Sequence, residues 1–314
     1  MLAYLTRRLI ESLVVLLLMS ALVYLLIGLM PGDPIDLMIS GNPDLTTADA
    51  QRLRELYGLD KPLIERYLTW LGQAVQGDFG WSRNFGRPAL EVLGWALVNT
   101  LWLMLPALAL ALLLAIPLGL AGAARPGRVV DRGVGLLAVS SLSVPTFWLA
   151  LLLIYLFAVE LRWLPAGGMG EESGLERLRA LVLPVLTLAL GTLGIYLRFV
   201  RRAAGEALRQ DFVRTARAKG VSRRRLLWGH VLQNAALPLV TLIGLSFGAL
   251  FSGALVTEVI FRQLGMGRVL YDAVAGNDFN LALVGLLVAT AATLLGNLLA
   301  DLAYARLDPR IELT

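Results

Sequence analysis

Six long apolar runs constrain this chain more than any other feature. The four inner runs contain no charged residue, and the outer two contain one each, Glu11 near the start of the first and Asp301 near the end of the last. An α-helix rises about 1.5 Å per residue and a bilayer's hydrocarbon core is about 30 Å thick, so about 20 apolar residues cross it. We predict an all-α, polytopic membrane protein that forms a single membrane domain over residues 1–314. Its six predicted transmembrane helices cover about 9–30, 97–122, 133–159, 181–197, 231–257 and 281–303.

The first run begins after Arg7 and Arg8, as the apolar core of a secretory signal would. Its apolar stretch is longer than the roughly 7–15 residues of such a core, and no small-x-small cleavage site follows it. The segment 31–34 reads Pro-Gly-Asp-Pro and predicts a turn. We interpret the run as a retained transmembrane helix.

The distribution of basic residues predicts the orientation in the membrane. If the N-terminus is cytoplasmic, the inside segments 1–8, 123–133, 198–230 and 302–314 hold 17 of the 28 lysines and arginines. The longer outside segments hold the other 11, together with 16 of the 23 acidic residues. Cytoplasmic loops of membrane proteins carry an excess of Lys and Arg. We therefore expect both termini in the cytoplasm, and we attribute the net charge of +5 to topology rather than to nucleic-acid binding.

The outside segment 31–96 is long and has helical signals of its own. A short helix is predicted over 48–57, because Thr46 and Asp49 resemble a capping box and Gly58 is a stop. A second helix is predicted to begin near Pro62, where Leu63 and the apolar residues after it recur at helical spacing. This extracytoplasmic helical insertion is either a cap on the outer face or a contact for an extracytoplasmic partner, and the two are compatible.

Residue types that catalysis, metal binding and ion coupling need are scarce. The chain has no cysteine and one histidine, His230, which argues against thiolate chemistry and multi-histidine metal sites. No Gly-Lys pair occurs, so the GxxxxGK[ST] phosphate loop is missing. No ionisable residue lies in the middle of a predicted span, whereas ion-driven carriers usually need one there. We predict a protein that is not an enzyme, binds no cofactor or metal, and is driven from elsewhere, with an ion-driven carrier as the alternative.

Several predicted spans contain hydroxyl and amide side chains. Each of them more often packs helices together than lines a path, but as a group they suggest a bundle with a neutral polar interior. Candidate residues for the lining of a pathway are Ser143, Thr146, Thr241, Ser246, Ser252 and Asn297.

The largest inside segment, 198–230, holds ten basic and two acidic residues. A helix is predicted over 206–219 from its Ala, Leu and Arg content, with Gly220 as its break. Ser222 is predicted to cap a second helix over 223–228. Such a loop can lie on anionic lipid headgroups or dock into another protein and transmit force.

The sequence of this loop resembles a motif of a known family. The stretch RTARAKG, nine further residues and then HVLQ are similar to the EAA loop of binding-protein-dependent ABC importer permeases, in which Gly220 occupies the family glycine. Four positions depart from that pattern: Arg214 replaces Glu, Thr215 replaces Ala, His230 replaces Ile and Gln233 replaces Pro. The sequence RTARAKG is similar to the corresponding stretch in the dipeptide, oligopeptide and nickel branch of the family. Further stretches that resemble the first permease type of this branch are RRLIESLVVLLLMSALVYLLIGLMPGDP, YGLDKPLIERYLTWLGQAVQGDFGWS, SLSVPTFWLALLLI, TEVIFRQLGMGRVL and ARLDPRI.

The resemblance implies a type I ABC importer permease fold in a prokaryotic inner or plasma membrane. It implies that this chain and a second, homologous permease form the pathway, that two ABC ATPases bind ATP and Mg²⁺, and that a soluble binding protein delivers the substrate. Di- or oligopeptides are the expected cargo, with nickel chelates or oligosaccharides as alternatives. The residues expected to couple the ATPases to transport are Asp211, Arg214, Thr215, Ala216, Arg217, Ala218, Lys219, Gly220 and Ser222.

Overall fold

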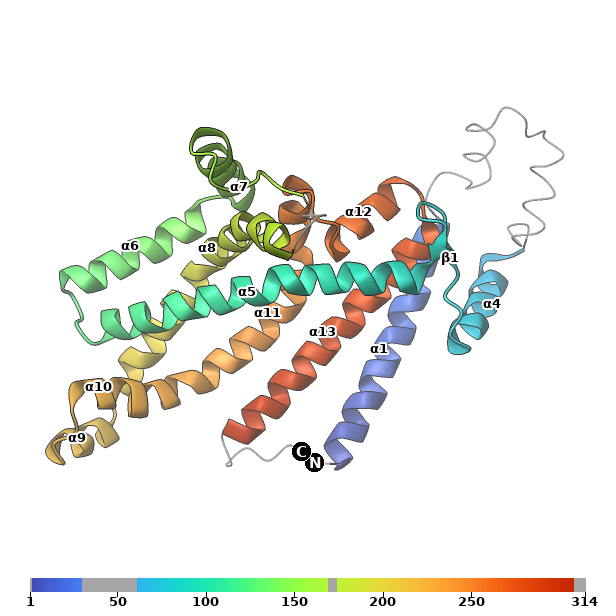
Figure 1. The fold of residues 1–314 in the computed structure, drawn as a ribbon. Coiled ribbons are helices and arrows are strands. Elements are labelled where there is room, and N and C mark those ends of the chain that lie inside the picture. The colour runs from blue at the N-terminus through green and yellow to red at the C-terminus, as the bar shows by residue number, and fades with distance from the viewer. Residues whose placement is uncertain (1, 30–60, 169–173, 308–314) are drawn as a thin grey trace. The chain divides into compact units, whose positions relative to one another are not determined.

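A computed structural model of the chain describes residues 2–29, 61–168 and 174–307. These residues are helical almost throughout, with one two-stranded hairpin, as the predicted all-α class requires (Figure 1). The helix predicted over 48–57 lies outside the described residues. The chain divides into two compact units, residues 1–96 with 269–292 and residues 97–268 with 293–314.

In the first unit, helix α1 (Leu2–Gly28) packs against helix α4 (Leu63–Val75), which is the second helix predicted for the outside segment. α4 buries Tyr67 and Trp70, whose stacked rings have centroids 6.3 Å apart. The hydroxyl groups of Tyr67 and Ser20 share a buried hydrogen bond of 2.9 Å. The ring of Tyr24 in α1 packs against both aromatic rings, with centroids 5.5 Å from Tyr67 and 6.0 Å from Trp70. Aromatic packing and the hydrogen bond therefore fix α4 to α1. The other described elements of the unit are β1 (Trp81–Ser82), β2 (Arg87–Pro88), the first turns of α5 (Ala89–Ala123), most of α12 (Met266–Ala275) and the first part of α13 (Phe279–Leu307).

The hairpin of β1 and β2 is fixed to the turn between α12 and α13 by one carboxylate. Asp278 is buried, and its Oδ2 accepts hydrogen bonds from Ser82 Oγ at 2.5 Å and from the Asn84 backbone N–H at 2.9 Å. Its Oδ1 accepts a third, at 3.3 Å, from the backbone N–H of Leu281 in α13. We call residues 80–88 with 276–281 the hairpin corner. Because its buried donors and acceptors satisfy one another, the corner is a rigid polar junction.

The second unit is built around α8 (Gly174–Ala207), which packs against α6, α7 and α11. Small residues allow close approach, as is common between membrane helices. A Cβ added at Gly119 of α5 would lie 2.7 Å from Val200 Cγ1 of α8. Ser141 of α6 donates a hydrogen bond to Leu190 O and accepts one from Gly194 N of α8. The elements of this unit other than α5 and α8 include α6 (Val129–Ser143), α7 (Thr146–Ile154), the π-helix η1 (Tyr155–Glu160), α9 (Asp211–Ala218), α10 (Arg223–Arg225), the π-helix η2 (Leu226–Val231) and α11 (Leu232–Ile260).

The third apolar run, predicted as one span over 133–159, is broken in the structure. α6 ends at Ser143, and the helix pair α6 and α7–η1 is bent by 96°. Pro145 has no backbone N–H and disfavours helical geometry at the residue before it, and Val144 accordingly has an extended ψ of 118°. The sequence contained the proline, but it did not reveal how large the bend would be.

Among the described residues, four helices are long and apolar enough to cross a membrane, and the bent pair raises the number to as many as five. They are Tyr4–Gly28 in α1, Ala89–Ala123 in α5, Gly174–Ala207 in α8 and Phe279–Leu299 in α13. These agree with four of the predicted runs in position. α11 covers the fifth run, but many side chains in its middle lie outside the described residues. The chain is a multi-pass membrane protein, and the count of six spans stays a prediction.

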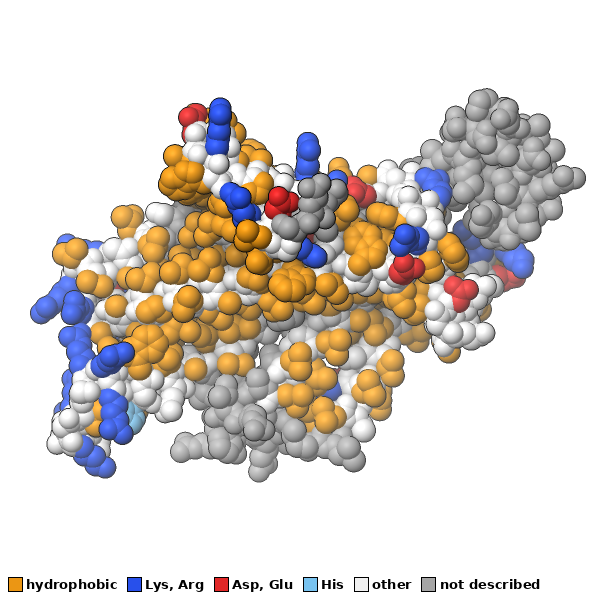
Figure 2. All heavy atoms as spheres, in the orientation of Figure 1, with side chains coloured by type: hydrophobic (Ala, Val, Ile, Leu, Met, Phe, Trp, Pro, Cys, Tyr) orange, Lys and Arg blue, Asp and Glu red, His pale blue; other side chains and the backbone are white. Residues whose placement is uncertain are grey.

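Large apolar side chains lie on the surface of these helices, as expected of helices that face lipid or partner helices. On α1, for example, Leu9 and Leu18 are exposed over more than half of their surface. Figure 2 shows hydrophobic side chains over most of the visible face, whereas Lys and Arg gather around α9 and α10. The contrast agrees with apolar helices that end in a basic loop.

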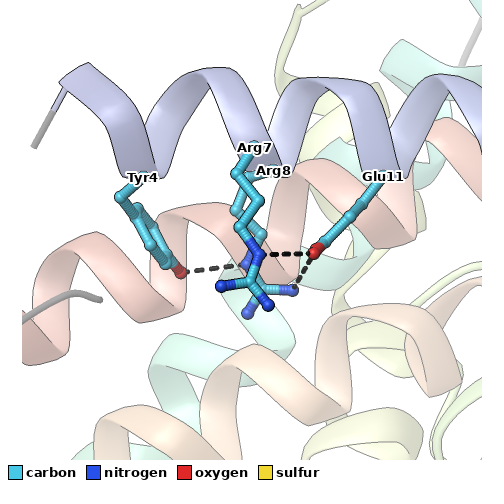
Figure 3. Close-up of polar contacts among 4 residues, drawn as sticks. All are labelled: Tyr4, Arg7, Arg8 and Glu11. Atoms are coloured by element: carbon cyan, nitrogen blue, oxygen red, sulfur yellow. Dashed lines mark hydrogen bonds and ion pairs between the residues drawn. The ribbon is translucent and has the colours of Figure 1, made fainter.

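The start of α1 neutralises its one acidic residue. Glu11 pairs with Arg7 Nε at 3.0 Å and with Arg8 Nη1 at 3.7 Å (Figure 3). Arg8 Nε also donates a hydrogen bond to the hydroxyl of Tyr4 at 3.0 Å. Long arginine side chains can follow an apolar surface and keep their charged ends in the polar interface. This cluster therefore allows α1 to begin its apolar run without an unpaired carboxylate.

The stretch TEVIFRQLGMGRVL also has a structural explanation. Glu258, near the end of α11, is fully buried and accepts hydrogen bonds from Thr100 Oγ1 at 2.6 Å and from the Arg268 backbone N–H at 2.9 Å. A Cβ at Gly265 or at Gly267 would overlap or crowd this carboxylate. The two glycines are thus needed for the loop to wrap around Glu258.

Candidate functional site

The basic loop, residues 198–230, is an ordered set of short helices in the structure. α8 continues to Ala207, a turn follows over 208–210, and α9 (Asp211–Ala218) begins after Gln210, which is extended at φ −79° and ψ 157°. The single helix predicted over 206–219 is therefore wrong in one respect, because the chain breaks before Asp211. Good helix formers occupy the break, so propensity alone did not reveal it.

α9 has one buried and one exposed side. Val213 is 1% exposed and Ala216 is 8% exposed, and both belong to the main hydrophobic core of the second unit. Eight of the nine predicted coupling residues are exposed, Ala216 being the exception. Arg214 and Asp211 lie 3.9 Å apart on the exposed side. α9 thus presents a short charged surface while two small apolar side chains hold it to the core.

Gly220 ends α9 in the manner predicted for a glycine stop. Its φ is +73°, a left-handed conformation that other residues adopt at a cost. The Gly220 N–H bonds to Arg217 O at 3.0 Å, and the Val221 N–H bonds to Ala216 O at 3.1 Å. These two bonds form a Schellman motif, which satisfies the last carbonyls of the helix. The glycine therefore sets the direction in which the chain leaves α9.

Ser222 stands at the predicted N-terminal cap of the next helix, but its side chain makes no capping hydrogen bond. Its carbonyl accepts the Leu226 N–H at 2.9 Å instead. The helix predicted over 223–228 is a turn of α-helix that continues as the π-helix η2 and then as α11. His230 lies in η2, where its backbone carbonyl accepts a bond from Asn234 Nδ2.

An ion pair at the start of the basic loop was not predicted. Arg201 Nε lies 2.6 Å from Asp131 Oδ1, and the Gly127 N–H donates to Asp131 Oδ2 at 2.9 Å. The Asp131 side chain is only 9% exposed. The pair ties the turn between α5 and α6 to α8, just ahead of α9. Sequence analysis missed the pair because its partners are 70 positions apart and no sequence pattern links them.

The structure describes only some of the candidate pathway residues. Ser143 is exposed and donates its hydroxyl to Val139 O at 2.9 Å, within its own helix. Thr146 lies at the bend, where a Cβ added at Gly191 of α8 would lie 3.5 Å from its Oγ1. Asn297 is half-buried in α13. The side chains of the other three candidates lie outside the described residues: Thr241, Ser246 and Ser252.

Comparisons with known proteins agree with this arrangement. The family model "Binding-protein-dependent transport system inner membrane component" matches residues 115–313, and the N-terminal model of the same systems matches residues 1–119. The oligopeptide transport system permease protein AppB of Bacillus subtilis (strain 168) is 38% identical over 99% of this chain and 100% of its own length. The glutathione transport system permease protein GsiC of Escherichia coli (strain K12) is 36% identical over 99% of both chains.

A permease protein of Brucella suis biovar 1 (strain 1330) is 41% identical over 100% of both chains. Among solved structures, a chain of the inward-facing MetNI methionine ABC transporter superposes with a TM-score of 0.57 and 17% identity, covering 70% of this chain and 98% of that one. That likeness establishes a shared fold. With a family model over 115–313 and relatives aligned from end to end, this chain belongs to the inner membrane components of binding-protein-dependent transport systems, the permeases of ABC importers.

Proposed function

We propose that this permease imports di- or oligopeptides, with a second homologous permease, two ABC ATPases and an extracytoplasmic solute-binding protein as its partners. The observation that carries the proposal is α9, a short exposed helix with a fixed glycine stop and an apolar attachment to the core. Such a helix is suited to docking on another protein. The names of AppB and GsiC, which refer to oligopeptide and glutathione transport, favour peptides as the cargo.

We propose six transmembrane helices with both termini in the cytoplasm of a prokaryotic cell. In chain order, the six spans are α1, α5, the bent pair α6 and α7–η1, α8, α11 and α13. The bias of Lys and Arg toward the segments 1–8, 123–133, 198–230 and 302–314 supports the orientation. The segment 31–96 then faces the solute-binding protein, and the basic loop faces the ATPases.

The proposed mechanism transmits ATPase motion through α9. ATP and Mg²⁺ bind to the partner ATPases, and their closure displaces α9 through contacts with its exposed residues. Val213 and Ala216 carry the displacement into the core around α8, and the Schellman motif at Gly220 carries it toward α11. The helices then switch access between the two sides of the membrane. This chain itself catalyses no reaction in the scheme.

The substrate pathway is proposed to be lined by neutral polar groups, among them Ser143, Thr146, Thr241, Ser246, Ser252 and Asn297. Hydroxyl and amide groups accept varied peptides and also sugars, so oligosaccharides or nickel chelates remain alternative cargo. A nickel site made by this chain is disfavoured, because the sequence has one histidine and no cysteine. The solute-binding protein is expected to set the selectivity.

Copurification tests the assembly. The tagged chain is extracted in mild detergent, and mass spectrometry identifies the proteins that accompany it. We expect a second permease and two ATPases. Recovery of this chain alone, under conditions in which a known ABC complex survives, would contradict the proposal and favour an ion-driven carrier.

Labelling of single cysteines tests the orientation. The chain contains no cysteine, so each introduced thiol is unique. We expect a membrane-impermeant maleimide to label Trp81→Cys in intact cells, and to label Arg224→Cys only after the membrane is opened. Both positions are exposed in the structure. Labelling of Arg224→Cys in intact cells would overturn the orientation.

A further inference from the structure

A cleft of about 910 Å³ lies in the second unit, between the end of α5, α8 and the segment from α9 to η2. Its lining is strongly basic. Six arginines line it, against two carboxylates: Arg198, Arg201, Arg202, Arg209, Arg217 and Arg223. The docking surface proposed for α9 does not account for this cleft, because Arg217 is the one coupling residue among its lining residues.

The two carboxylates of the cleft are already paired. Asp131 binds Arg201 at 2.6 Å, and Glu206 binds Arg202 at 3.0 Å. The other four arginines have no acidic partner within the described chain, although Arg223 donates a hydrogen bond to Ala124 O at 2.8 Å. The cleft therefore holds four guanidinium groups without a counter-charge, which is the environment that an anion requires.

The cleft has room for a ligand beside α8. Gly205 of α8 lines it between Arg201 and Arg209, and a Cβ added at Gly205 would meet no atom within 4 Å. Apolar side chains complete the lining, among them Leu208 and Leu227. Charged groups beside an apolar wall match an amphipathic ligand better than a free ion.

We propose that this cleft binds the phosphate of an anionic phospholipid headgroup, with the apolar wall against its glycerol and upper acyl chains. Arginine suits this role because its planar fork can donate two parallel hydrogen bonds to a phosphate. The choice of a lipid rests on the proposed function, whose orientation places the ends of α5 and α8 at the cytoplasmic leaflet, where anionic lipids create a negative surface potential. A bound headgroup then joins the α5–α6 turn to α8 and α9, and it steadies the helix that meets the ATPase.

Two kinds of variant test separately whether lipid binding needs the positive charge of the cleft and whether it needs the open volume of the cleft. Arg198→Gln and Arg209→Gln each remove one unpaired cation, and Gly205→Leu fills the cleft with every charge retained. The matched controls are Arg224→Gln, an exposed arginine of the same loop outside the cleft, and Gly133→Leu, an exposed position of α6 where an added Cβ also meets nothing. Helical circular dichroism and the elution volume of each variant must match those of the wild type.

The test is native mass spectrometry of the purified full chain, titrated with phosphatidylglycerol or with phosphatidylcholine of the same acyl chains. We expect selective retention of phosphatidylglycerol, about fivefold weaker binding after each arginine substitution, and its loss in Gly205→Leu. The two controls should bind as the wild type does. Equal retention of both lipids, or an equal loss in Arg224→Gln, would overturn the proposal.

Two further arms identify the occupant. If millimolar inorganic phosphate displaces phosphatidylglycerol, the lipid proposal is wrong and the cleft binds a soluble phosphate group. If the lipid is released when purified ATPases are added, the lipid proposal is wrong and a protein occupies the cleft. Lipid retention by the isolated chain needs neither ATPase nor transport, so its result is independent of the copurification experiment.

Discussion

The hairpin corner of the first unit and α9 of the second are both short structures outside the long helices, but they are held in opposite ways. In the corner, the buried Asp278 accepts three hydrogen bonds from side chains and backbone. In α9, two small apolar side chains and a glycine stop form the attachment, and the charged groups stay outside. A buried polar junction breaks only at a high cost, whereas a small apolar contact can shift. The difference indicates a fixed frame in the first unit and a movable part in the second.

The largest expected effect tests the frame. Asp278→Ala removes the acceptor for Ser82, Asn84 and Leu281 and leaves buried donors unpaired. We expect the free energy of unfolding to fall by about 3 kcal/mol. Thermal unfolding in detergent, followed by far-ultraviolet circular dichroism, measures it. The control is Glu91→Gln, which breaks an exposed ion pair with Arg87 and should cost less than about 1 kcal/mol. Equal effects of the two variants would mean that the corner is no rigid junction.

The next prediction concerns the ion pair that ties α8 to the α5–α6 turn. Asp131→Ala leaves Arg201 and the Gly127 N–H without their acceptor, and we expect a loss of about 2 kcal/mol, since Arg201 is partly solvated. A double-mutant cycle with Arg201→Ala should give a coupling energy of about 1 kcal/mol. In the assembled importer, Asp131→Ala should lower transport per ATP hydrolysed. If the losses of stability in the two single variants add up to the loss in the double variant, Asp131 and Arg201 are not coupled, and the pair does not link the α5–α6 turn to α8.

Substitution of Gly220 tests whether transport depends on the geometry at the end of α9 more than on the stability of the protein. Gly220→Val forces a β-branched residue to φ +73°, and we expect local strain of about 1–2 kcal/mol with a large loss of transport. Gly220→Asn is the matched control, because Asn tolerates this conformation. ATP hydrolysis and uptake by the reconstituted importer, measured together, separate the two effects. Full uptake by the Val variant would contradict the coupling role of the stop.

The sequence predicted those parts of the molecule that depend on local patterns. The apolar runs indicated α1, α5, α8 and α13 because burial in lipid requires continuous apolar length. Gly220 was predicted as a stop because glycine, which has no Cβ, adopts the conformation at the end of a helix more readily than other residues. The pair of Asp131 and Arg201 was missed because the contact joins distant positions of common charge types.

Two other features show the same limit. The break at 208–210 occupies residues that favour helices, and it accompanies the packing of Val213 and Ala216 on the core. The bend at Pro145 was signalled by a proline, but its 96° angle depends on the contacts of α7 with α8 and α11. Tertiary contacts, rather than propensities, decided both.

The smallest expected effect on stability is at Arg214, and it separates docking from folding most clearly. Arg214 is 86% exposed, and its nearest carboxylate, that of Asp211, is 3.9 Å away and 98% exposed. Solvent screens such a pair, so Arg214→Gln should leave thermal unfolding unchanged. If α9 docks on an ATPase, the same substitution should still weaken recovery of that ATPase in copurification, since it removes a cation from the exposed side. Arg224→Gln, with an exposed arginine outside α9, is the control. Unchanged recovery in both variants would mean that the charged side of α9 is a solvated surface, and the docking contact would then have to involve other residues of the basic loop.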